Sequence, residues 1–225
     1  MVAERELREA LGLTKKLTSA ELFDVEGQTP LSDEDLLGLI PEHIETRAQL
    51  NEWEAANIML ARRQLARRKQ AFDVSSTAGL IALHRLMFGR TWTWAGQYAK
   101  SLTQFSDPRT PRSVQLHELV ANTNETLRTS NRSPADLDEI AMRFHHRLTQ
   151  IHAWPNGNGR HAREATDQLL RRLGRRPFVW GADEPLIAKG DVREAYISAL
   201  KAADAGDFSH LRLFLRSPGR EPEKT

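Results

Sequence analysis

The sequence predicts one mainly α-helical domain with its own hydrophobic core, and three observations support that prediction. Apolar residues recur at helical spacing in several segments, whereas period-two alternation is nearly absent outside two short stretches. A chain of 225 residues is long enough to bury a full hydrophobic core. The chain has no cysteine, so the fold cannot depend on disulfides or on a thiolate metal site. We therefore expect one helical domain with an N-terminal extension.

The expected boundaries divide the chain into an arm, a domain and a tail. The arm covers residues 1–43, with a short helix over residues 3–11 and turns punctuated by Gly and Pro around another short helix near Ser32. Residues 44–216 form the helical domain, and residues 217–225 form a disordered tail.

The first part of the domain is expected to contain two helices. A long helix runs from Glu45 to Phe72, because apolar side chains recur along it between many charged ones. Ser75 or Ser76 can cap the next helix, which ends at Phe88.

The remainder of the domain is expected to be a two-stranded flap followed by helices. Residues 98–112 contain two prolines and have no helical period, which favours a β-hairpin. A short extended stretch, residues 177–180, separates two of the later helices. These helices are expected at residues 113–129, 135–152, 158–173, 190–204 and 208–216.

Charge and hydropathy exclude several classes of function. The chain carries 32 basic and 30 acidic residues, a formal net charge of only +2, so no nucleic-acid partner is indicated. The N-terminus lacks the apolar core of a signal peptide, and no apolar run approaches the roughly 20 residues of a membrane span. We expect a cytoplasmic protein with no membrane partner.

The stretch from His152 to Arg163 concentrates the residue types of phosphate chemistry. The turn Gly157–Gly159 opens into a helix, where free N–H groups and the positive end of the helix dipole attract anionic oxygens. Arg160 and Arg163 lie three residues apart on one helix face and can add charge-assisted contacts to phosphate. His152 ends the preceding helix, where an imidazole can accept a proton from an attacking hydroxyl. The stretch therefore predicts a phosphate-binding site with its own base.

The other histidines nearby give a weaker argument for a metal site. His145 and His152 are two helical turns apart, roughly 10 Å, which is too far for two ligands of one ion. Neighbouring residues such as His145 and His146 point in different directions. We expect a core or surface role for these two side chains and a solvent-facing position for His161.

The segment from His152 to Arg163 resembles the signature of the Fic/Doc family, His-x-Phe-x-(Asp/Glu)-Gly-Asn-Gly-Arg-x-x-Arg. Trp154 replaces the family's Phe conservatively. Asn156 is a departure, because it replaces an acidic residue that holds magnesium in the family, and an amide oxygen is a weaker ligand than a carboxylate. The matching positions are His152, Gly157, Asn158, Gly159, Arg160 and Arg163.

The resemblance extends over roughly residues 25–216. Residues 83–96 resemble the helix end and Trp-Ala-Gly turn before the family's flap, and residues 196–207 resemble its closing helices. Residues 27–31, 39–41 and 46–57 are similar to the subgroup called mobile mystery protein B. The resemblance implies a Fic-type helical bundle with a short β-hairpin flap before the central helices.

The resemblance also implies an activity, the transfer of AMP from ATP to a hydroxyl side chain of a target protein. His152 would be the catalytic base. The N–H groups of Gly157–Gly159 would hold the α- and β-phosphates, Arg160 the leaving phosphates and Arg163 the γ-phosphate. Asn156 would hold Mg²⁺, or Mn²⁺, weakly or through water.

Glu54 is the candidate inhibitory residue on the helix expected over residues 45–72. Fic proteins are often restrained by a helix carrying Ser/Thr-x-x-x-Glu-Gly/Asn, whose Glu pairs with the second signature arginine, here Arg163. The segment Leu50–Ala55 keeps the Glu but lacks the hydroxyl and the Gly/Asn. An ordinary surface carboxylate remains the alternative interpretation of Glu54.

Two other functions remain open. A Doc-like protein kinase would transfer the γ-phosphate, although Gly159 stands where that branch has Lys. A catalytically weak nucleotide-binding module would explain the missing acid at Asn156, although it has no need of His152. For either enzyme, the resemblance implies target docking on the flap near residues 98–111. It also implies a toxin-like bacterial role, with an antitoxin-like or helix-turn-helix partner, and homo-oligomers as an open alternative.

Overall fold

The structure is a computed structural model that describes residues 31–100, 109–180 and 191–216. The prediction of a mainly α-helical protein is confirmed within these ranges. The helices are α2 (Asp33–Leu36), α3 (Arg47–Ala66), α4 (Thr77–Phe88), α5 (Arg112–Thr129), α6 (Pro134–Ile151), α7 (Asn158–Arg172), α8 (Asp191–Asp204) and α9 (Ser209–Arg216).

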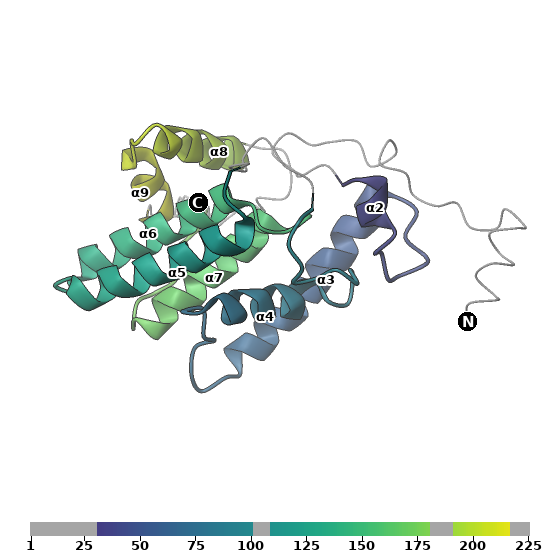
Figure 1. Ribbon diagram of the computed structural model, residues 1–225, viewed down its shortest axis with the longest axis horizontal. Coiled ribbons are helices and arrows are strands. Elements are labelled where there is room, and N and C mark those ends of the chain that lie inside the picture. Colours follow the sequence, from purple (N-terminus) through teal and green to yellow (C-terminus); the bar gives the residue numbers. More distant parts are fainter. Residues whose placement is uncertain (1–30, 101–108, 181–190, 217–225) are drawn as a thin grey trace, which may run out of the picture.

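Three helices lie side by side at the centre of the molecule (Figure 1). They are α5, α6 and α7, and α6 packs against both of the others. The pair α8 and α9 covers part of this layer through contacts between α9 and α6. Helix α4 packs against α7, and α3 packs against α4 and also pairs with α7 through side chains, as between Arg62 and Glu164. The C-terminal end of α6 and the N-terminal end of α7 are joined by residues 152–157, so the His152–Arg163 stretch lies at one end of the central layer.

Polar side chains determine where several helices begin. Thr46 and Ser133 each accept a hydrogen bond from the backbone N–H three residues later, and the side chain of that later residue accepts one from the N–H of the cap residue. Ser76 rather than Ser75 caps α4, since its hydroxyl accepts from Gly79 N–H at 3.0 Å. These local signals explain why most helices begin within two residues of their expected positions.

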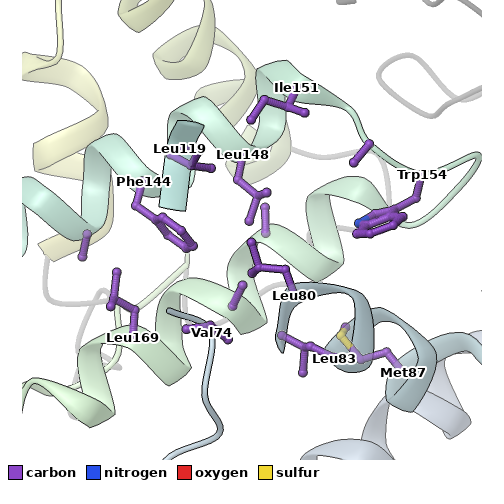
Figure 2. Close-up of a cluster of buried hydrophobic side chains, with 14 of the residues drawn as sticks. Val74, Leu80, Leu83, Met87, Leu119, Phe144, Leu148, Ile151, Trp154 and Leu169 are labelled. Carbon is purple, nitrogen blue, oxygen red and sulfur yellow. The ribbon is translucent and has the colours of Figure 1, made fainter. Parts of the chain in front are cut away.

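The hydrophobic core is one continuous cluster that joins all of the larger helices. Figure 2 shows Leu80, Leu83 and Met87 of α4 facing side chains of α6 and α7, with Trp154 at the end of the same cluster. Leu31, inside the expected arm, is also buried in this core with 5% of its surface exposed. The arm therefore packs on the domain at least from that residue onward.

Helix α3 ends at Ala66, six residues before the predicted end at Phe72. Leu65 is the last residue of α3 whose side chain is buried in the core. The side chains of residues 67–70 are exposed, so continuing the helix would bury nothing. The chain instead turns toward α7, where the Phe72 N–H donates to Gln168 Oε1 at 3.0 Å.

The predicted flap lies largely outside the described residues, because residues 101–108 are not among them. The β-hairpin therefore stays a prediction. The expected helix over residues 3–11 and the tail at residues 217–225 also lie outside that part of the chain. None of the described helices combines the length and the apolar character that crossing a membrane requires.

Candidate active site

His152 is the C-cap of α6 and has a left-handed backbone, with φ 49° and ψ 55°. A residue other than Gly seldom adopts this conformation, and such residues concentrate at functional sites. Burial lowers the pKa of His152 to about 4, and the nearby Arg112 guanidinium adds to the effect. The imidazole is therefore neutral at pH 7 and able to accept a proton.

Arg112 holds the backbone of this histidine in place. Its Nε donates to the His152 carbonyl at 3.1 Å and its Nη1 donates to the Ala99 carbonyl at 2.7 Å. The Ala99 N–H in turn donates to the Ala153 carbonyl at 2.9 Å. One nearly buried guanidinium thus joins the base to the chain entering the expected flap. The sequence analysis missed Arg112, because no local pattern marks a residue that acts 40 positions away.

The turn after His152 is closed by side chains as well as by its glycines. Asn158 Oδ1 accepts from the Trp154 N–H at 2.9 Å, and Asn158 Nδ2 donates to the Trp154 carbonyl at 2.7 Å. Gly157 has φ 80°, and a Cβ added there would lie 2.3 Å from Phe88 Cζ. The turn therefore needs Gly157 for both its backbone conformation and its contact with α4.

His84 is a second residue that the sequence analysis missed. Its Nδ1 accepts from the Gly96 N–H at 2.9 Å, so its Nε2 carries the hydrogen and donates to the Asn156 carbonyl at 3.1 Å. Burial is the main cause that holds the pKa of His84 well below 6.5, and the ring lies against Phe88 and Trp154 with centroids 4.7 and 4.6 Å away. This neutral histidine ties the Trp-Ala-Gly turn to the candidate phosphate-binding loop.

The N-terminus of α7 is open to an anionic ligand. The first N–H groups of a helix have no intrahelical acceptor, and Gly157 at the N-cap supplies no side-chain oxygen. A Cβ added to Gly159 would meet only Arg163 Nη1, at 3.6 Å. The Arg163 guanidinium therefore lies beside the first turn of its own helix, and the predicted positive site and helix N-terminus coincide.

Arg160 and Arg163 have different neighbours in spite of their shared helix face. The Arg160 guanidinium carbon lies 5.1 Å from the Phe88 ring centroid, and Nη1 lies 2.8 Å from Glu54 Oε2. The Arg163 guanidinium carbon lies 5.8 Å from the Tyr196 ring centroid, and burial is the main cause that lowers the pKa of Arg163. Glu54 thus pairs with the first arginine of the stretch, whereas the resemblance implies a pair with the second.

Glu54 is completely buried on α3, at 0% exposure, so the interpretation as a surface carboxylate is wrong. Its Oε1 accepts from Trp92 Nε1 and from Asn156 Nδ2, both at 2.7 Å. Its Oε2 makes a close charge contact with Arg160 that lacks hydrogen-bond geometry. The structure therefore brings three of the predicted site residues together: Glu54, Asn156 and Arg160.

The other histidines considered in the sequence analysis, His145, His146 and His161, are buried and partnered. His145 Nε2 lies 2.8 Å from the Tyr196 hydroxyl, and His146 Nε2 lies 2.8 Å from Asp204 Oδ1. The solvent-facing position expected for His161 is wrong, because the ring is 0% exposed and its Nε2 lies 2.9 Å from the Leu80 carbonyl. No group of three or more metal-binding side chains occurs in the described part of the chain.

Comparisons with known proteins agree with this geometry. A curated relative, "Protein adenylyltransferase Fic" of Nematostella vectensis, is 29% identical over 147 residues, which cover 65% of this chain and 32% of the relative. The chain thus spans about a third of the length of that relative.

Solved structures share the fold. The BepC effector protein from Bartonella tribocorum, solved with bound AMPPNP, superimposes with a TM-score of 0.60 at 18% identity and covers 89% of this chain and 96% of that chain. Fic-1 from C. elegans gives a TM-score of 0.58 at 21% identity, over 92% of this chain and 59% of that chain. The model of the Fic/DOC family matches residues 74–170, which run from α4 into α7 and include the whole His152–Arg163 stretch, so this part of the chain matches a Fic/DOC family domain.

Proposed function

We propose that this protein transfers AMP from ATP to a hydroxyl side chain of a target protein, and that it can also modify itself. The observation that supports this most directly is a neutral histidine, His152, placed five residues before an uncapped helix N-terminus that Arg163 flanks. The name of the curated relative and the nucleotide analogue in one structural neighbour agree with the same chemistry.

In the proposed reaction, His152 takes the proton of a Ser, Thr or Tyr hydroxyl of the target. The hydroxyl oxygen forms a bond to the α-phosphorus of ATP, the bond to the bridging oxygen breaks, and pyrophosphate leaves in line. The N–H groups of Gly157–Gly159 bind the α- and β-phosphates, Arg160 the leaving phosphates and Arg163 the γ-phosphate. The site would act mainly by positioning and by stabilising phosphoryl charge.

A divalent cation such as Mg²⁺ or Mn²⁺ fits this site only as a companion of the nucleotide. Asn156 Nδ2 is directed at Glu54, which leaves Asn156 Oδ1 as the neutral oxygen available to a hard cation. When bound, the cation would neutralise phosphate charge. Asn156 would hold it weakly, so we expect a raised requirement for magnesium.

Glu54 is the proposed inhibitory residue. Its carboxylate contacts Arg160, one of the two side chains proposed to bind phosphate, at 2.8 Å. An anionic phosphate that uses Arg160 competes with this carboxylate, because two negative groups repel each other beside one partly buried cation. Replacing Glu54 by Gly should therefore increase labelling of the protein by ATP.

The test uses ATP labelled in the α-position and, in parallel, ATP labelled in the γ-position. We would compare the wild type, His152→Ala, Glu54→Gly and the double variant, with His117→Ala as the control, because His117 is an exposed histidine of α5. We expect α-label on the protein or on lysate proteins, more of it with Glu54→Gly, and none whenever His152 is absent. The control should match the wild type.

Two other results would change the assignment. Transfer of only the γ-label would favour a Doc-like kinase. Binding of ATP without transfer of either label, in the Glu54→Gly variant as well, would favour a nucleotide-binding interaction module. Target docking on residues 98–111, an antitoxin-like or helix-turn-helix partner and a toxin-like role remain proposals that this assay does not address.

A further inference from the structure

Four side chains from three distant parts of the chain form a buried cluster around one carboxylate. We define the Glu54 cluster as Glu54, Trp92, Asn156 and Arg160. Both hydrogen bonds to Oε1 are 2.7 Å long, and the charge contact between Oε2 and Arg160 is 2.8 Å long. The cluster therefore contains one negative charge, one positive charge and two neutral donors.

Every neighbour in the cluster suits an ionised carboxylate. Burying a carboxylate is costly unless hydrogen-bond donors and an opposite charge replace the lost water. Trp92 offers only a donor, its indole N–H, and the Asn156 amide offers its NH₂ group. The loop and the tryptophan are thus complementary to Glu54 in its charged form.

An acidic residue at position 156 would destroy this complementarity. An oxygen in the place of Asn156 Nδ2 would lie about as close to Glu54 Oε1 as the nitrogen does, 2.7 Å. Two carboxylates at that distance in a buried site repel each other, and one must take up a proton or move away. The single Arg160 cation cannot neutralise both.

Asn156 also has little freedom to avoid Glu54. Its carbonyl accepts from His84 Nε2 at 3.1 Å, and its side chain is buried at 4% exposure. The next residue but one, Asn158, closes the turn through its two hydrogen bonds to Trp154. These hydrogen bonds fix the backbone around Asn156, and burial leaves its side chain little room to turn away from Glu54.

We infer that Asn156 is a positioning residue for Glu54: the amide at the loop position and the carboxylate on α3 form a matched pair. In this view the departure from the family's acidic residue is the feature that lets a buried glutamate reach Arg160. The pair itself does not depend on any reaction. Its consequence, that Asn156 stabilises the inhibited state, rests on the proposed function.

The test exchanges the two chemical groups. We would measure thermal unfolding midpoints at pH 7.5 for the wild type, Asn156→Ala, Asn156→Asp, Glu54→Gln and the double variant Glu54→Gln/Asn156→Asp. Asn156→Asp should lower the midpoint by at least about 5 °C and by more than Asn156→Ala does, because it adds repulsion to the lost hydrogen bond. The double variant restores one carboxylate and one amide and removes the repulsion between two carboxylates. Because Glu54 Oε1 also accepts from the Trp92 N–H, an NH₂ group in its place leaves that N–H without its acceptor, so the double variant should recover only part of that loss.

The inference is overturned if Asn156→Asp unfolds at the wild-type midpoint, or if the double variant loses as much as the two single variants combined. Labelling with α-labelled ATP separates the inference from the proposed function. The double variant should then be labelled more than the wild type and should need less magnesium. A double variant that is more stable than Asn156→Asp but takes up no label supports the matched pair and counts against the proposed transfer reaction.

Discussion

Replacing Gly157 by Ala should destabilise the protein for two reasons that can be separated. The first is the backbone, because Gly157 has φ 80° and a side chain in the left-handed region costs roughly 1–2 kcal/mol. The second is contact, because the new Cβ would lie 2.3 Å from Phe88 Cζ. Overpacking a core typically costs about 1–3 kcal/mol.

The Phe88 ring cannot easily move away from the new methyl group. It is completely buried, it lies against the His84 ring with centroids 4.7 Å apart, and the Arg160 guanidinium covers it. The two contributions should therefore add to roughly 2–5 kcal/mol, which for a chain of this size lowers the unfolding midpoint by about 4–20 °C.

Two other glycines provide matched controls. Gly174 has φ 71° but nothing within 4 Å of an added Cβ, so Gly174→Ala should show the backbone cost alone. Gly159 lies in the first turn of α7 with only Arg163 Nη1 near an added Cβ, so Gly159→Ala should be neutral or stabilising, by up to about 1 kcal/mol. Chemical denaturation of all three variants, followed by circular dichroism, gives the free energies of unfolding.

The order of the three variants tests the reasoning. Gly157→Ala should lose the most stability, Gly174→Ala less and Gly159→Ala least. If Gly157→Ala loses no more than Gly174→Ala, then the contact with Phe88 is not restrictive and the turn is less tightly packed than described.

Three further predictions concern single side chains. Arg112→Met removes the hydrogen bonds from this cation to the His152 and Ala99 carbonyls, which should cost about 2 kcal/mol. It should also raise the pKa of His152 above about 4 in a histidine NMR titration, whereas Arg147→Met, at an exposed arginine, should do neither. Burial raises the pKa of Asp167 to about 7, so the folded state binds a proton more tightly than the unfolded state does. The free energy of unfolding should therefore fall as the pH rises from about 4 to about 7. Asp167→Asn should remove that loss and be more stable than the wild type in urea at pH 8; a less stable variant would refute the argument. Leu80→Ala should cost roughly 2–5 kcal/mol in the same assay, because the side chain is completely buried between α4 and α7, and a smaller loss would mean that the core closes around the cavity.

Helix positions were predictable because their signals are local. Apolar periodicity and the caps at Thr46, Ser76 and Ser133 lie within a few residues of the structure that they determine. The prediction failed where tertiary contacts overrode the pattern. The pattern extended the long helix to Phe72, but the chain leaves the helix after Ala66 and bonds to Gln168 on α7.

The candidate site also has a part that local sequence predicts and a part that depends on tertiary contacts. The residues from His152 to Arg163 are close in sequence, so their spacing alone predicts a base, an open helix N-terminus and two cations in one place. The solvent-facing position expected for His161 requires that one face of α7 be exposed. Helix α7 instead lies between α4 and α6 and is buried on most sides. Periodicity on one helix cannot reveal how many neighbours that helix has.

By itself, the sequence determined the helical class and the composition of the phosphate-binding stretch, because both depend on interactions within a few turns of chain. Only the tertiary structure decided that Glu54 reaches Asn156 from 102 residues away, that Trp92 joins them from 38 residues away, and that Arg112 and His84 hold the loop. Those contacts depend on how α3 and α4 pack against α7 and how α5 packs against α6. Packing follows from the sum of many buried surfaces, and no short sequence pattern encodes it.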